Sequence, residues 1–199
     1  MYCPPHFRAD PAEALALLAQ APRLGFLVCN GDAAPALSPV PLLLKDGALI
    51  GHLARANPQA AALAAAGRAV AIFPGADAYV SPSLYPSKAA HHRVVPTWNY
   101  EVVTVEGAAT VTDDAATLHA IVSALTDAAE ASRDAPWAVT DAPAPFVAGQ
   151  IKGILGVTIA AETVIAKRKA SQNKDPADRE GVRAGLAAGD AAARAIGAL

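Results

Sequence analysis

The chain has 199 residues, of which 53% are hydrophobic and 5% aromatic, and its formal net charge at pH 7 is −2. This length suits a single domain, taken as residues 1–199, with a sizeable core. The slightly acidic balance is not that of a polybasic nucleic-acid-binding protein, and no run approaches the ~20 apolar residues that a membrane-spanning helix needs.

The N-terminal residues lack the basic segment and apolar run of a signal peptide, which indicates a cytoplasmic protein. The two cysteines, Cys3 and Cys29, have no metal-binding or redox spacing, so we expect reduced thiols. His91 and His92 are adjacent, point apart on an extended chain and lack a companion Cys or carboxylate cluster. We therefore expect no metal site.

Local signals predict helices and strands along the first half of the chain. Asp46-Gly47 is typical of a two-residue hairpin turn, Asn57-Pro58 of a helix start, and Gly67 of the residue after a helix. In chain order we expect a helix at 11–20, strands at 23–30, 35–45 and 47–53, a helix from 57 to about 67, and short strands at 68–75 and 78–81 joined by a glycine-containing turn.

The second half begins with a long proline-containing loop and ends with a helical extension at about 175–199, which Asp175 and Pro176 introduce. Between them we expect a loop at 81–96, a strand from 96 to about 111, a helix at 112–133, a short helix after a turn at 135–145, and a strand at 154–169. Short strands joined by hairpins, with helices inserted, favour a small antiparallel β-barrel over a doubly wound sheet.

The segment GHLARANP (51–58) brings an arginine to the end of a strand, directly before a helix start. The planar, permanently charged group of Arg55 suits a phosphate, and the N-terminus of a helix presents free N–H groups. This pattern indicates a phosphate site. An ordinary surface arginine followed by a helix cap is the alternative interpretation.

The segment YVSPSLYPSK (79–88) covers the end of the preceding strand and the first half of the predicted loop. Ser81 can cap a one-turn helix that begins at Pro82, and Tyr85 and Lys88 are candidates to contact a ligand. A proline-rich surface loop without function is the alternative.

The segment VPTWNY (95–100) starts the following strand. Alternation along a strand sends Thr97 and Asn99 to one side and Trp98 and Tyr100 to the other. One pair can then present hydrogen-bonding groups while the other forms aromatic walls. Packing of the two aromatic residues in the core or in a dimer interface is the alternative.

The segment AKRKASQNK (166–174) begins a basic cluster, because residues 167–183 hold six basic and three acidic side chains. Such a cluster suits an anionic ligand or partner, and a solvated strand end is the alternative. No hydrolytic or nucleotide-binding motif accompanies these segments, so we expect a bound cofactor to supply any reactivity.

Five stretches, in this order and spacing, resemble the signature of the PaiB-like family of FMN-binding negative transcriptional regulators: MYCPPHFR, GHLARANP, YVSPSLYPSK, VPTWNY and KASQNK. That family is similar to the flavin-binding split barrels. The resemblance implies a six-stranded antiparallel Greek-key split barrel with added helices, and a homodimer with FMN at the subunit interface. It also implies a flavin-linked regulatory or sensing role, with a small-molecule ligand possible.

The resemblance implies that Arg55, His52 and the helix starting at Asn57 hold the FMN phosphate. Residues lining the cavity or closing it, from this chain or its partner, complete the site. The expected cofactor-binding residues are Ser38, His52, Leu53, Arg55, Asn57, Ser81, Lys88, Thr97, Trp98, Asn99, Lys169 and Gln172. The chain departs from the family pattern at Ser38-Pro39, where a Thr-His pair is usual, and at Leu84, where Trp is usual.

Two other functions are weighed against this one. The first is a flavin-dependent oxidoreductase acting on a small substrate, for which Lys88, His91 and His92 are the nearest titratable candidates. The second is direct DNA binding, which receives little support because the sequence shows no helix-turn-helix with a basic recognition helix.

Overall fold

The computed structural model describes residues 1–198, which group into two units. The ring unit holds Pro11–Phe73 and Thr104–Val164, and the terminal unit holds Met1–Asp10, Pro74–Val103 and Ile165–Leu199. Leu199 itself lies outside the described residues.

The sheet formed by the described residues has seven strands in the order β4-β1-β2-β3-β6-β5-β7, and a further pairing of β4 with β5 closes six of them into a ring. The strands are β1 (Arg23–Cys29), β2 (Ala36–Lys45), β3 (Ala48–Ala54), β4 (Arg68–Val80), β5 (Thr97–Thr112), β6 (Ile154–Ala160) and β7 (Thr163–Lys169). The pairs β1–β2, β1–β4, β2–β3, β3–β6 and β5–β6 are antiparallel. The order β4-β1-β2-β3 is that of a Greek key. The predicted antiparallel Greek-key split barrel is confirmed, with seven strands rather than six because β7 is added beside β5.

The hairpin between β2 and β3 is the one that the sequence predicts. Asp46 and Gly47 both have positive φ, at 50° and 79°, and Lys45 pairs with Ala48 across the turn. Left-handed backbone at both central residues matches the right-handed twist of the two strands. This turn fixes the register that places GHLARANP at the far end of β3.

Alternate positions of β3 are buried, so Leu49 and Leu53 face the interior of the ring unit and His52 lies on the opposite face. Aliphatic side chains from several strands fill this interior. Those with 0% exposure include Leu27, Leu42, Leu49, Val157 and Ile159.

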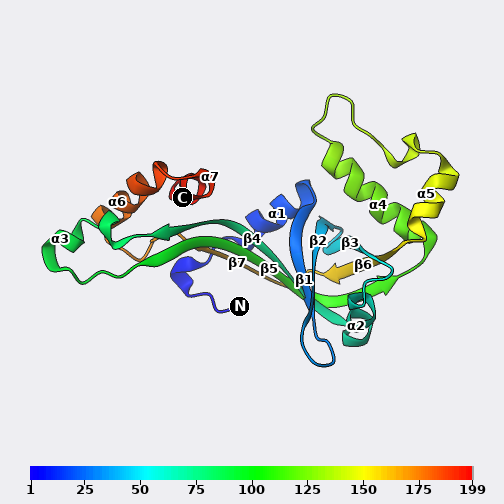
Figure 1. Cartoon of the computed structure of the whole chain (residues 1–199), viewed down its shortest axis with the longest axis horizontal. Coiled ribbons are helices and arrows are strands. Elements are labelled where there is room, and N and C mark those ends of the chain that lie inside the picture. The colour runs from blue at the N-terminus through cyan, green and yellow to red at the C-terminus, as the bar shows by residue number, and fades with distance from the viewer. Residues whose placement is uncertain (199) are drawn as a thin grey trace. The chain divides into compact units, whose positions relative to one another are not determined.

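Five helical segments complete the ring unit, and Figure 1 shows α4 beside α5. Asp114 Oδ2 accepts from Thr117 N at 2.8 Å and caps α4, while Gly67, at φ 63°, ends α2 as predicted. α4 packs closely on β6 at Gly156, where a Cβ would lie 2.9 Å from Ile121 Cδ1. The segments are α1 (Pro11–Gln20), α2 (Gln59–Ala66), α4 (Ala115–Glu130), η3 (Val139–Asp141) and α5 (Ala144–Ile151).

The terminal unit combines strand ends with short helices, and α6 and α7 pack on each other within it (Figure 1). Asp175 Oδ1 accepts from Asp178 N at 3.0 Å, which confirms the predicted start of the C-terminal helices. The helical segments are η1 (Pro5–Phe7), η2 (Pro82–Leu84), α3 (Ser87–His91), α6 (Pro176–Ala187) and α7 (Ala191–Gly197). The core of the unit includes Val80, Tyr85, Val182, Leu186 and Ile196.

The prediction of two short strands at 68–75 and 78–81 is wrong, because β4 runs without interruption from Arg68 to Val80. Gly75, which suggested a turn, lies where the next strand approaches closely: a Cβ there would be 2.8 Å from Glu101 Cβ. A glycine inside a strand often marks such an approach rather than a turn.

Two further predictions need correction. The loop expected at 81–96 contains α3 in addition to the predicted one-turn helix at Pro82, which is η2, and the single strand expected at 154–169 is divided into β6 and β7. Between the two strands, Glu162 Oε1 accepts from Ala108 N at 3.1 Å and Oε2 pairs with Arg68 at 3.0 Å.

Cys3 and Cys29 are both free thiols. Within residues 1–198, no helix has the length and apolar character needed to cross a bilayer.

Candidate functional site

The predicted site residues fall into two groups, one in each unit. Five belong to the ring unit, and the structure joins two of them directly: Asn57 Nδ2 donates to Ser38 Oγ at 2.9 Å. Asn57 Oδ1 accepts from Gln59 N at 2.9 Å, so the same side chain caps α2. The predicted helix start and the strand β2 are thus linked by one amide.

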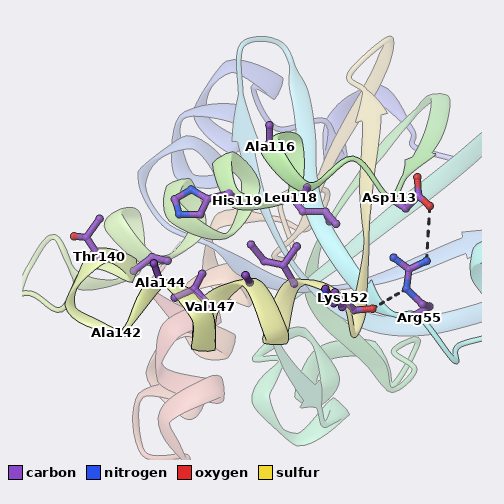
Figure 2. Close-up of a pocket in the computed structure, with 14 residues that line it drawn as sticks. Arg55, Asp113, Ala116, Leu118, His119, Thr140, Ala142, Ala144, Val147 and Lys152 are labelled. Atoms are coloured by element: carbon purple, nitrogen blue, oxygen red, sulfur yellow. Dashed lines mark hydrogen bonds and ion pairs between the residues drawn. The ribbon is translucent and has the colours of Figure 1, made fainter.

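Arg55 is held by backbone carbonyls (Figure 2). Its Nε donates to Lys152 O at 2.8 Å and its Nη2 to Ile154 O at 3.3 Å, which ties the end of β3 to the start of β6. Nη1 lies 3.8 Å from Asp113 Oδ2, an ion pair longer than a hydrogen bond. The guanidinium is therefore fixed in position while one of its edges is still able to donate to a ligand.

His52 and Leu53 are neighbours with opposite surroundings. His52 Nδ1 is buried and has no hydrogen-bond partner among the described residues. Burial lowers the pKa of His52 below its ordinary value, which favours the neutral ring at pH 7. Leu53 is 4% exposed and belongs to the core, so its side chain is not available to a surface ligand.

In the terminal unit the structure brings Thr97, Trp98 and Lys169 together. Lys169 Nζ donates to Thr97 Oγ1 at 2.5 Å and also to the carbonyl oxygen of Trp98. Partial burial, followed by the charges of Lys167 and Lys174, lowers the pKa of Lys169. The Lys169 side chain is thus a hydrogen-bond donor in a fixed position, and it gives up its proton more readily than an ordinary lysine.

An exposed aromatic pair lies beside this group. Trp98 is 54% exposed, and its ring meets Tyr79, itself 51% exposed, edge to face with centroids 6.0 Å apart. Large aromatic side chains left half in water are suited to contact a flat apolar group.

Two other predicted residues have hydrogen-bond partners within the protein. Asn99 is 1% exposed and exchanges hydrogen bonds with Ser171, at 3.1 and 3.2 Å. Gln172 donates to Arg168 O and accepts from Ala170 N, both at 2.6 Å, which closes the loop after β7. Both side chains support the local structure, and both residues line a pocket of about 200 Å³ in the terminal unit.

The two remaining predicted residues belong to the segment after β4. Ser81 accepts from Ser83 N at 3.2 Å and caps η2, which confirms its predicted capping role. Lys88 lies exposed on α3. Tyr85, also considered as a ligand contact, is instead 2% exposed, with its hydroxyl buried and without a partner among the described residues.

Sequence reasoning missed several residues that shape these groups. Asp113 and Lys152 define the surroundings of Arg55, and Lys152 does so through a backbone carbonyl that carries no sequence signal. Tyr79 completes the exposed aromatic pair. Tyr79 lies two residues before Ser81, in the segment YVSPSLYPSK. Its position in that segment is the sequence signal that could have identified it.

Comparisons with known proteins place this arrangement in a family. A family model described as "Putative FMN-binding domain" matches residues 1–163. "Protease synthase and sporulation protein PAI 2" of Bacillus subtilis is 30% identical over 182 residues, which cover 89% of this chain and 85% of that protein. An uncharacterised protein of Aspergillus fumigatus is 35% identical over 175 residues, covering 72% of this chain and 67% of that protein.

Among solved structures, a conserved hypothetical protein of Mycobacterium tuberculosis is similar, with a TM-score of 0.60 at 16% sequence identity. The match covers 84% of this chain and 90% of that one, and at this identity it shows the fold alone. The family model and the Bacillus relative show that the chain belongs to the PaiB-like family of FMN-binding domains.

Proposed function

We propose that the chain binds FMN and has a flavin-linked regulatory or sensing role. The observation that carries the proposal is the match of the FMN-binding family model to residues 1–163. The Bacillus relative is named "Protease synthase and sporulation protein PAI 2", and the link of that protein to sporulation supports a regulatory role over a metabolic one.

Residues of the ring unit fit the phosphate of FMN. Arg55 is a cation fixed by two carbonyls, and Asn57 stands at the start of α2. The buried Nδ1 of His52, which has no partner among the described residues, is a polar atom that a ligand would satisfy. A phosphate, which accepts several charge-assisted hydrogen bonds, suits this donor set.

Residues of the terminal unit fit the isoalloxazine ring, as a separate proposal. Trp98 and Tyr79 offer aromatic surface, and Lys169 with Thr97 offers donors for the polar rim of the ring. Trp98→Ala is expected to weaken FMN binding, whereas Trp137→Ala, which removes a tryptophan of similar exposure (48%), is expected to leave it unchanged. Equal effects of the two substitutions on the dissociation constant would remove Trp98 from the site.

A flavin-dependent oxidoreductase is the second candidate, since bound FMN supplies reversible one- and two-electron transfer. Lys169, with its lowered pKa, is the candidate acid–base group for such a reaction. The two functions differ in turnover. FMN-loaded protein is assayed for NAD(P)H oxidation with a panel of acceptors. The regulatory role predicts no rate above that of free FMN, and sustained turnover with any acceptor would favour the enzyme.

We also propose a homodimer with FMN at the subunit interface, and little direct DNA binding. Sedimentation velocity across a range of protein concentrations is expected to show the mass of two chains. A gel shift with purified protein is expected to be weak, and a strong, sequence-specific and salt-sensitive shift would contradict this view.

A further inference from the structure

A groove of about 590 Å³ lies between α4 and α5 in the ring unit (Figure 2). Leu118 on α4 and Val147 and Ile151 on α5 line it with apolar surface, and alanines at several other positions keep it open. Of its lining residues, only Arg55 also belongs to the expected flavin set. Pockets of about 300–1,000 Å³ with apolar walls and a few polar groups are typical of small-molecule sites.

The charged side chains of the groove gather at one end. In Figure 2, Arg55, Asp113 and Lys152 lie at that end, and Thr140 and Ala142 lie at the other. The two cations stand against the single carboxylate among the lining residues, so this end has a net positive charge. An anion is therefore favoured there over a cation.

Arg55 is prepared for such an anion. Its hydrogen bonds to the Lys152 and Ile154 carbonyls fix the guanidinium. The Arg55 side chain therefore loses less conformational entropy when a ligand binds. The 3.8 Å separation between Nη1 and Asp113 Oδ2 leaves the donors on that nitrogen available.

We propose that this groove binds a small organic acid, with its carboxylate at Arg55 and Lys152 and its apolar body along Leu118, Val147 and Ile151. Arg and carboxylate match each other in charge and planar geometry, and the apolar walls exclude ligands that are polar throughout. The charge at one end and the small volume favour such an acid over a segment of a second copy of the chain. The carboxylate and the phosphate of FMN would both use the Nη1 donors of Arg55, so the acid is expected to bind the FMN-free protein and to compete with FMN.

Calorimetric titration with three probes tests it: 1-naphthylacetate, the neutral analogue 1-naphthylacetamide, and acetate. The first is expected to bind saturably, the amide about tenfold more weakly because it lacks the charge, and acetate not measurably. Binding of 1-naphthylacetate is also expected to weaken as salt rises.

Two substitutions locate the probe. Lys152→Gln removes the cation but keeps the carbonyl that accepts from Arg55, and Ala148→Leu fills the groove from α5. Each substitution is expected to weaken the binding of 1-naphthylacetate about fivefold or more. Lys152→Gln removes one charged contact, and Ala148→Leu removes space for the probe. The matched controls, Lys45→Gln and Ala129→Leu, change exposed residues outside the groove and are expected to bind the probe normally.

Several results would overturn the proposal. These are equal affinity for acid and amide, no saturable binding of the acid, or unchanged binding in both groove variants. Probe affinity that falls as protein concentration rises would also overturn it, because a second copy of the chain would then occupy the groove. FMN uptake, measured on the same variants without the probe, is expected to be unchanged in Lys152→Gln and Ala148→Leu, so a failure of the flavin proposal is distinguished from a failure of this one.

Discussion

Arg55 illustrates how a single residue can serve structure and binding together. Its Nε and Nη2 support β6, and Nη1 keeps donors for an anion. Arg55→Ala is expected to weaken FMN binding about 10- to 100-fold, since hydrogen bonds to charged groups are worth about 1.5–3 kcal/mol. Fluorescence titration measures this against Arg194→Ala, an exposed arginine on α7. Equal dissociation constants would remove Arg55 from the site. Urea unfolding of Arg55→Ala separates lost binding from lost structure.

Asn99 is expected to matter for stability through its buried pair with Ser171. Asn99→Ala leaves the Ser171 hydroxyl without its partner, which is expected to lower the free energy of unfolding by about 1–3 kcal/mol. The double variant with Ser171→Ala is expected to cost less than the sum of the two single ones, as contacting residues do. Additive losses in urea unfolding would show that the pair contributes nothing as a pair.

Asp178 links α3 to α6 through two hydrogen bonds from Ser87, at 3.0 and 2.7 Å. Burial acts to raise the pKa of Asp178, but these bonds, with the charges of Lys174 and His91, outweigh it and lower the pKa. A carboxyl with a depressed folded-state pKa contributes stability above its unfolded pKa of about 4, and loses it as pH falls through the folded value.

The stability difference between the unmodified chain and Asp178→Asn is therefore expected to shrink as pH falls from about 6 to about 3. Chemical unfolding at several pH values measures it, with the exposed Asp134→Asn as the control. A difference that stays constant over this range would contradict the depressed pKa.

At the scale of elements, local signals predicted most helix ends and one hairpin. Asp46-Gly47 and the caps at Asn57 and Asp175 depend on neighbours in the sequence, and the structure has each of them. The site residues were harder to predict. Asn99, predicted to contact the cofactor, also pairs with Ser171, which is 72 residues away, and no local pattern reports such a pair.

The same limit explains the errors in the elements. α3 is held by the contact of Ser87 with Asp178, which lies 91 residues later. The local sequence does not show this contact, so it predicted a loop there. Gly75 suggested a turn in the sequence, because its close neighbour in space, Glu101, lies on another strand and leaves no local signal.

The close approach at Gly75 gives a prediction for β4. Gly75→Ala puts a Cβ 2.8 Å from Glu101 Cβ and is expected to destabilise the chain by about 1–3 kcal/mol. Gly149→Ala on α5 is the control: a Cβ there meets nothing within 4 Å, and alanine favours the helix by about 0.5–1 kcal/mol. Opposite shifts in the thermal midpoint are expected. A neutral Gly75→Ala would mean that β4 and β5 separate at little cost.

At the scale of the whole molecule, the Greek-key ring and the family match lead to one central claim, that the chain is a flavin protein. The absorption spectrum tests it most directly. The purified chain is incubated with FMN, passed through a desalting column and scanned. The two flavin bands are expected to stay with the protein in a stoichiometric amount. A colourless protein after this treatment, still folded by circular dichroism, would contradict it.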